Sequence, residues 1–347
     1  MTQTALAQRT GFSQATISKW ESGIRPIASD EVRVIADVLE YPETLFDIPD
    51  KVYKQSALID FMFRRGMSVR QRALGAICAQ LELLAIHLKP LFTGIEVAPA
   101  LLLPRLVPNP QEDGAAAVAS LVRTQWRIPA GPIPQLIPLI EAAGIVVVPF
   151  NFSGEKIDAV TVVRPDMLPI IFADFSKPVD RLRFNLAHEL GHLIMHAYDD
   201  SPIDETERDL EVEANTFAGA FLVPARDIEN HIFPGIGLDD FLALKQRWRV
   251  SIKCLIYRSA AVEILSEERK ISLYKGLSYR GWNRHEPGML DAESPVLIHE
   301  ILRVHQQDLE YTIEDLARLM HVTERDLRHV FLGEPLPSSR LRIISHE

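Results

Sequence analysis

Cysteine is scarce in this sequence, with two residues, Cys78 and Cys254, among 347. They lie far apart and neither belongs to a CxxC pair, which excludes a disulfide framework and a zinc site made of thiolates. The N-terminal segment lacks the basic and apolar regions of a signal peptide, and no apolar run reaches the roughly 18 residues that a membrane span requires. The sequence therefore predicts a cytoplasmic protein with no membrane partner.

Glycine-rich phosphate-binding motifs are absent as well, so nucleotide hydrolysis has no support. Positive charge is in deficit: 37 lysine and arginine residues stand against 47 acids, which gives a net charge of −10. Such a chain repels polyanions as a whole, and any contact with nucleic acid must be local. Hydrophobic residues make up 47 % and charged residues 24 %, as in globular proteins, and the length allows two or three domains.

Apolar periodicity and proline content divide the chain into four predicted segments. These are a helical module over 1–50, a helical and proline-rich connection over 51–138, a core over 139–235, and a helical C-terminal region over 236–347. In the core, three short β-rich runs between residues 144 and 175 precede two helices. The predicted fold class is α+β, a small sheet with its helices, flanked by helical regions at both ends.

The most informative motif is His188-Glu189-Leu190-Gly191-His192, inside a helix predicted over 180–197. Histidines four residues apart share one face of a helix, one turn from each other, so both imidazoles converge on one zinc ion. Glu189 lies beside them, where its carboxylate takes a proton from the water that the metal activates. The motif predicts a metal-dependent hydrolase.

A catalytic zinc needs a third protein ligand. Glu211, Glu213 or a nearby acid of the next predicted helix, over 205–222, can supply it. On a helical wheel Glu211 lies about 60° from the centre of the apolar stripe, and Glu213 lies about 100° away. Glu211 is therefore the better candidate.

His196 continues the face of His188 and His192. It lies roughly 12 Å along the helix axis from His188, too far for one ion to bind all three histidines. It either supports the ligands, faces the substrate, or is a partly buried histidine that is hydrogen-bonded to the backbone.

The run FNLAHELGHLIMH, followed by EVEANTFAGAFLVP, resembles the ImmA/IrrE family of zinc-dependent peptidases. The resemblance covers about residues 145–225. It implies a zincin-like peptidase core in which His188, His192 and Glu211 hold zinc and Asn215 supports one of the two histidines. This ligand set also admits manganese or iron.

A peptide substrate needs a place to bind, and the short strands before the helix offer an edge to which an extended peptide adds by backbone hydrogen bonds. We expect residues 170–172, Ile-Ile-Phe, to form that edge. The metal would polarise the scissile carbonyl while Glu189 activates water and then protonates the leaving amine.

Residues 6–23 read as a helix, a glycine turn, a capping Ser13 and a second helix. They resemble the XRE/Cro-like helix-turn-helix, without the helix that precedes this pair in that family. The resemblance places four DNA-binding candidates on the recognition helix: Gln14, Thr16, Ser18 and Lys19. Residues 1–50 carry four basic and eight acidic residues, a poor balance for phosphate binding. DNA binding and protein docking both stay open.

The spacing of Leu6, Phe12, Ser13 and Ile17 recurs twice, beginning at Leu244 and at Leu316, and each set describes a helix, a turn, a capping hydroxyl and a second helix. Any tight helix pair uses these residue types. The middle pair, within 245–258, is basic through Lys245, Arg247, Arg249, Lys253 and Arg258. It has the right charge to contact DNA or an acidic protein, or is a solvated helix face.

These observations predict a zinc-dependent endopeptidase that cleaves a partner protein, a transcriptional repressor, in a bacterial regulatory response. One alternative is a DNA-binding regulator whose peptidase-like domain senses a ligand without catalysis. A protein-docking scaffold, with neither metal nor operator affinity, is the other.

Overall fold

The computed structural model describes residues 1–48, 71–109, 111, 113–197 and 209–333. The chain divides into two compact units. The described part of the first comprises 1–48, 83–96 and 298–333, and that of the second comprises 71–82, 97–109, 111, 113–197 and 209–297. The four segments predicted from the sequence stay a prediction. In the structure, the described residues from 298 on share a unit with the N-terminal module, whereas residues 236–297 belong to the other unit.

The second unit contains a small mixed sheet. Within the described residues it has three strands in the order β1-β3-β2, namely β1 (Val146–Pro149), β2 (Ala159–Val162) and β3 (Ile170–Ala173). β1 pairs with β3 in parallel and β2 pairs with β3 antiparallel. The α+β fold class is confirmed.

The prediction that residues 170–172 form the sheet edge is wrong. They belong to β3, which is paired on both sides and fully buried. A continuous apolar run is what a strand covered on both faces requires, but such a run does not specify strand order. β1 and β2 are the outer strands of the described sheet.

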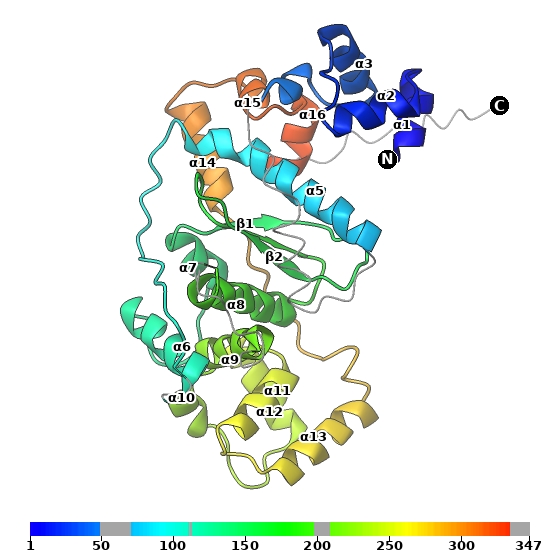
Figure 1. Cartoon of the computed structure of the whole chain (residues 1–347). Helices are drawn as coiled ribbons and strands as arrows, with labels where there is room; N and C mark the ends of the chain where they lie inside the picture. Colours follow the sequence, from blue (N-terminus) through cyan, green and yellow to red (C-terminus); the bar gives the residue numbers. More distant parts are fainter. Residues whose placement is uncertain (49–70, 110, 112, 198–208, 334–347) are drawn as a thin grey trace, which may run out of the picture. The chain divides into compact units, whose positions relative to one another are not determined.

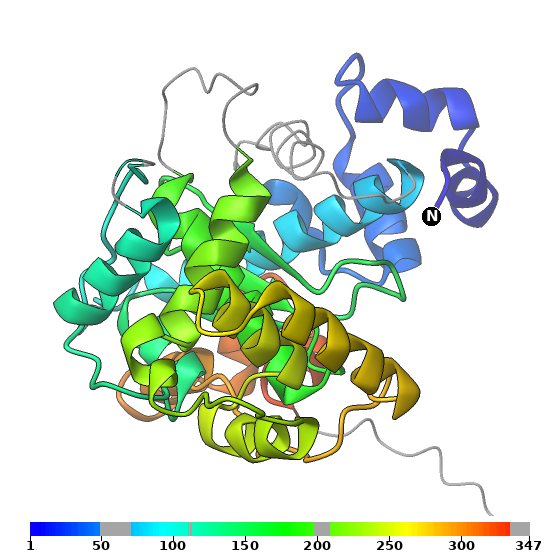
Figure 2. The same cartoon turned by 90° about the horizontal axis from the view of Figure 1, so that it is seen from below.

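Helices surround this sheet. The helices of the second unit are α5 (Gln71–Leu88, which continues into the first unit), α6 (Gly114–Gln125), α7 (Leu136–Ala142), α8 (Val179–Met195), α9 (Leu210–Leu222), α10 (Ala225–Glu229), α11 (Leu238–Trp248), α12 (Ile252–Ala261) and α13 (Glu267–Tyr279). α8 packs against β2 and β3 on one side and α9 on the other, and α6 packs on α9 (Figure 1). Figure 2 views this unit from the side of α11–α13.

The apolar stripe of α8 forms the centre of the core, with Leu186, Leu190 and Leu193 fully buried. A glycine lets α9 approach closely, because a Cβ at Gly191 would lie 2.9 Å from Cδ1 of Phe217. The close packing of α8 on α9 therefore depends on the glycine between His188 and His192.

Acidic residues after α13 hold the N-terminal half of α8 and the start of α7. Glu293 is buried, pairs with Arg183 of α8, and accepts backbone hydrogen bonds from Leu136 and Ile137. Asp180, in the first turn of α8, contacts Lys245 of α11 and does not cap the helix, whose N-cap residue is Pro178.

The first unit is helical throughout its described part. Its elements are α1 (Gln3–Thr10), α2 (Gln14–Glu21), α3 (Ser29–Leu39), η1 (Glu43–Asp47), η2 (Lys89–Phe92), α14 (Leu297–Gln307), α15 (Ile313–Leu319), α16 (Glu324–Asp326) and η4 (Leu327–Phe331). Ile17, Trp20 and Ile35 form the core of the N-terminal helices.

The three predicted helix pairs are α1–α2, α11–α12 and α15–α16, and each capping hydroxyl acts as expected. The side chains of Ser13, Ser251 and Thr323 each accept a hydrogen bond from a backbone N–H three residues on. A residue in the left-handed region precedes each cap by two positions: Gly11, Arg249 and His321. The shared spacing thus encodes a shared turn geometry.

One helical segment of the described residues, 73–92, is long and apolar enough to cross a membrane by length and composition. This corrects the expectation that no such stretch exists. It is weak evidence for a span, because core helices pass the same test, and Leu74, Leu81 and Leu88 on one face are fully buried.

Candidate metal centre

His188 and His192 lie one turn apart on α8 and aim the same ring nitrogen at one point. Their Nε2 atoms are 3.0 Å apart. The His192 side chain is 1 % exposed and that of His188 is 12 % exposed. The amphipathic pattern that buries Leu186 and Leu190 turns this face of α8 toward α9.

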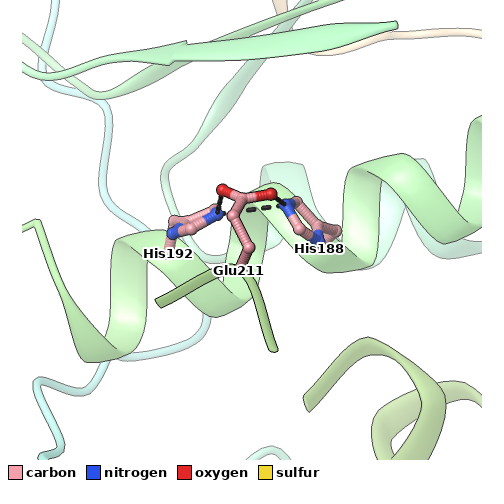
Figure 3. A group of neighbouring side chains, drawn as sticks. All are labelled: His188, His192 and Glu211. Carbon is pink, nitrogen blue, oxygen red and sulfur yellow. Dashed lines mark hydrogen bonds and ion pairs between the residues drawn. The ribbon is translucent and has the colours of Figure 1, made fainter. Parts of the chain in front are cut away.

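Glu211 comes from the first turn of α9, where the Asp209 side chain caps the helix. Its carboxylate reaches between the two imidazoles (Figure 3): Oε2 lies 3.5 Å from Nε2 of His188, and Oε1 lies 3.2 Å from Nε2 of His192. Its side chain is 35 % exposed, so the group reaches solvent on this side, as a catalytic metal site requires.

The spacing of the two imidazoles fits zinc. Ligand atoms about 2.0–2.1 Å from a tetrahedral ion stand about 3.3 Å from one another; the two Nε2 atoms are 3.0 Å apart, and each lies 3.2–3.5 Å from a different oxygen of Glu211. Where both Nε2 atoms keep their lone pairs, a cation among them and the carboxylate would offset their mutual repulsion. The donor set is also one that zinc uses in hydrolases.

The second nitrogen of each histidine has its own partner, which fixes the ring and its tautomer. Nδ1 of His188 lies 3.1 Å from Oδ1 of Asn215, so the amide oxygen accepts the Nδ1 proton. Nδ1 of His192 lies 2.9 Å from Nδ1 of His196. With a proton on Nδ1, each ring would keep the lone pair of Nε2 for an ion.

His196 in turn contacts an acidic side chain through its other ring nitrogen. Its Nε2 lies 2.9 Å from Oε2 of Glu213, and its side chain is 2 % exposed. Of the roles considered from the sequence, the geometry favours support of a ligand. Glu213, weighed there as a metal ligand, contacts His196; the role it has here was missed, because it depends on how α8 and α9 pack.

Glu189 is buried, with 1 % of its surface exposed. Its Oε2 accepts a hydrogen bond from Oγ1 of Thr161, on β2. Sequence reasoning did not find Thr161, since a lone threonine in the run Ala-Val-Thr-Val carries no signal of its own.

The DNA-binding candidates all lie on α2. Gln14 is exposed and donates to the side chain of Gln3. The hydroxyl of Thr16 bonds to the capping hydroxyl of Ser13, Ser18 is half-buried, and Lys19 is exposed. Gln14 and Lys19 are therefore the two most accessible of the four.

Part of the basic stretch 245–258 is buried. Lys245 is 3 % exposed and pairs with Asp180 and Glu286. Arg258 is 9 % exposed and donates to the carbonyl oxygen of Val223. The prediction of a basic binding face is wrong for these two residues, whereas Arg247 and Lys253 are exposed.

Comparison with known families agrees with the two resemblances. Residues 140–259 match the peptidase family M78, described as the IrrE N-terminal-like domain. Residues 1–46 match a helix-turn-helix family. No curated protein matches the chain. The predicted recognition is thereby confirmed, and the first match assigns residues 140–259 to a family of metallopeptidases.

Proposed function

We propose that this chain, whose residues 140–259 belong to the IrrE N-terminal-like peptidase family, is a zinc-dependent endopeptidase that cleaves a partner protein. The observation that carries the proposal is the convergence of His188, His192 and Glu211, whose donor atoms all lie within 4.8 Å of one another. Zinc is the expected ion, and manganese suits the same ligands.

Each residue has a distinct part in the reaction. His188, His192 and Glu211 would hold the ion, which when bound supplies Lewis acidity to a scissile carbonyl and lowers the pKa of water. Glu189 would take the proton of the attacking water and deliver it to the leaving amine nitrogen. Because Glu189 follows His188 directly on α8, its carboxylate is kept near the ligands by the helix itself.

The substrate would bind in an extended conformation along β2. β2 is an outer strand of the described sheet and packs on α8. Its four residues are buried, so a peptide would have to displace what covers this edge. Strand addition satisfies the backbone of a peptide without regard to its sequence, so selectivity for one protein would come from contacts outside this strand.

The substrate class we propose is a transcriptional repressor in a bacterial cytoplasm. The helix-turn-helix match over 1–46 supports a regulatory setting and a DNA partner. The same match supports a second candidate, a DNA-binding regulator that senses a ligand through the peptidase-like domain without catalysis.

The experiment compares the zinc-loaded wild-type protein with Glu189→Gln, using as substrate the transcription factor encoded beside this chain. We expect cleavage by the wild type, no cleavage by E189Q, and equal zinc content in both. The regulator alternative expects salt-dependent DNA binding that is unchanged in E189Q. Equal cleavage by both proteins would contradict the role of Glu189.

A further inference from the structure

A buried hydrogen bond joins the sheet to α8, the helix that carries His188 and His192. Oγ1 of Thr161 donates to Oε2 of Glu189 over 2.7 Å, between residues 28 positions apart. Thr161 is 5 % exposed and Glu189 is 1 % exposed. Because side chains alternate along a strand, Thr161 faces α8 while its neighbours Val160 and Val162 face the opposite side.

Packing alone does not explain why position 161 carries a hydroxyl group. A valine would fill the same space on an apolar strand, and a buried hydroxyl is costly unless it is hydrogen-bonded. A hydrogen bond from a hydroxyl to a carboxylate is short and directional. The torsion of a β-branched side chain is stiff, so β2 sets the position of this donor and thereby the orientation of the Glu189 carboxylate.

The backbone of Thr161 faces the outer edge of the sheet. The N–H of Asp174 donates to the carbonyl of Asp158, and the same register pairs Thr161 with Ile171. Hydrogen-bonded and non-hydrogen-bonded pairs alternate in an antiparallel ladder, so Thr161 and Ile171 form a non-hydrogen-bonded pair. The N–H and C=O of Thr161 therefore point away from β3, toward the side where another strand would add.

We infer that Thr161 is a positioning residue whose hydroxyl orients Glu189 for proton transfer. The inference rests on the proposed role of Glu189 as general base. It assigns to β2 a part in catalysis beyond holding the substrate.

The test compares Thr161→Val, which removes the donor at nearly constant shape, with Thr161→Ser, which keeps it. With the zinc-loaded protein and the same transcription factor as substrate, we expect kcat to fall about 10- to 100-fold in T161V, the size of a lost hydrogen bond to a charged group. KM should stay within about threefold, since the donor contacts the base and not the peptide. T161S should restore most of kcat.

Thr161→Cys, with a weak thiol donor, serves as a second variant should T161V not fold, and its kcat should lie between those of T161V and the wild type. Thr124→Val, a matched change at an exposed site on α6, should leave kcat unchanged. A kcat of T161V or T161C equal to that of the wild type would overturn the inference.

A second readout does not depend on activity. The carboxylate stretching band that disappears from the infrared spectrum in Glu189→Gln should be shifted in T161V and not in T161S. An unshifted band overturns the inference. If the band shifts but the wild-type protein cleaves nothing, the result counts against the proposed peptidase function and supports the contact.

Discussion

The Nδ1 atoms of His192 and His196 lie 2.9 Å apart, and the other ring nitrogen of His196 lies 2.9 Å from the Glu213 carboxylate. With Nε2 of His192 reserved for an ion, its Nδ1 proton is donated to His196, which donates its own Nε2 proton to Glu213. The chain of donors ends on a carboxylate and makes His192 a stronger ligand.

We therefore predict that His196→Ala weakens zinc binding about 10- to 100-fold, the usual cost of losing such a partner. Competition with a chromogenic chelator measures this affinity. His299→Ala, an exposed histidine on α14, is the control and should bind zinc as the wild type does. Equal affinities for H196A and the wild type would show that the contact does not act on the ion.

Arg183→Met should destabilise the fold by about 3 kcal/mol, because it removes the nearer of two arginines from the buried carboxylate of Glu293 and leaves Arg249 at 3.7 Å. Burial already lowers the pKa of Arg183, although Glu293 opposes that effect. Urea unfolding measures the loss. Arg181→Ala removes an ion pair with Asp158 in which the arginine side chain is 60 % exposed, and it should cost at most about 1 kcal/mol. Similar losses of stability in the two variants would contradict the prediction that the buried pair matters more than the exposed one.

Titration of the Glu141 carboxyl should make the folded protein less stable as the pH rises. Burial raises the pKa of this carboxyl from 4.5 to about 7, so between these values the folded state binds a proton that the unfolded state has released. The contribution of Glu141 is thus fully present below about pH 4.5 and is lost as pH rises through about 7.

Glu141→Gln keeps an acceptor for the N–H of Val296 and removes this titration. Thermal unfolding between pH 5 and 8 should therefore show a flatter profile for E141Q, with a difference on the order of 2 kcal/mol or less. Parallel profiles for the two proteins would contradict the prediction.

Gly191→Ala should destabilise the protein despite the higher helix propensity of alanine. The new Cβ would lie 2.9 Å from the Phe217 ring, and such overpacking costs about 1–3 kcal/mol, against a gain of about 1 kcal/mol from propensity. Gly75→Ala, on α5 with no atom within 4 Å of its added Cβ, is the matched control and should stabilise. Calorimetry of both variants measures these changes in stability. A stabilised G191A would contradict the prediction and show that α9 can move to accommodate the added Cβ.

The histidines of the candidate metal centre could be located from the sequence because their spacing is local: on any helix, positions 188 and 192 share a face. Glu211 followed from the apolar stripe of its own helix. The contacts of Glu213 and Thr161 could not be found in this way, because each depends on how a second element packs against α8.

Tertiary pairing also explains two of the errors. The run at 170–172 is apolar enough for any strand, and its place at the centre of the sheet depends on β1 and β2 lying on either side. Counting charges made Lys245 a surface residue, whereas Asp180 and Glu286, 65 and 41 positions away, bury it.

Glu211 stands in the first turn of α9, where the cap formed by Asp209 holds the backbone N–H groups of residues 211 and 212. An ion bound by Glu211 and by the two histidines would cross-link the beginning of one helix to the middle of another. Fraying of that first turn and release of the ion then become a single linked equilibrium. Chelation should accordingly loosen α9 from its N-terminal end, and hydrogen exchange at its first amides would report how tightly the ion is held.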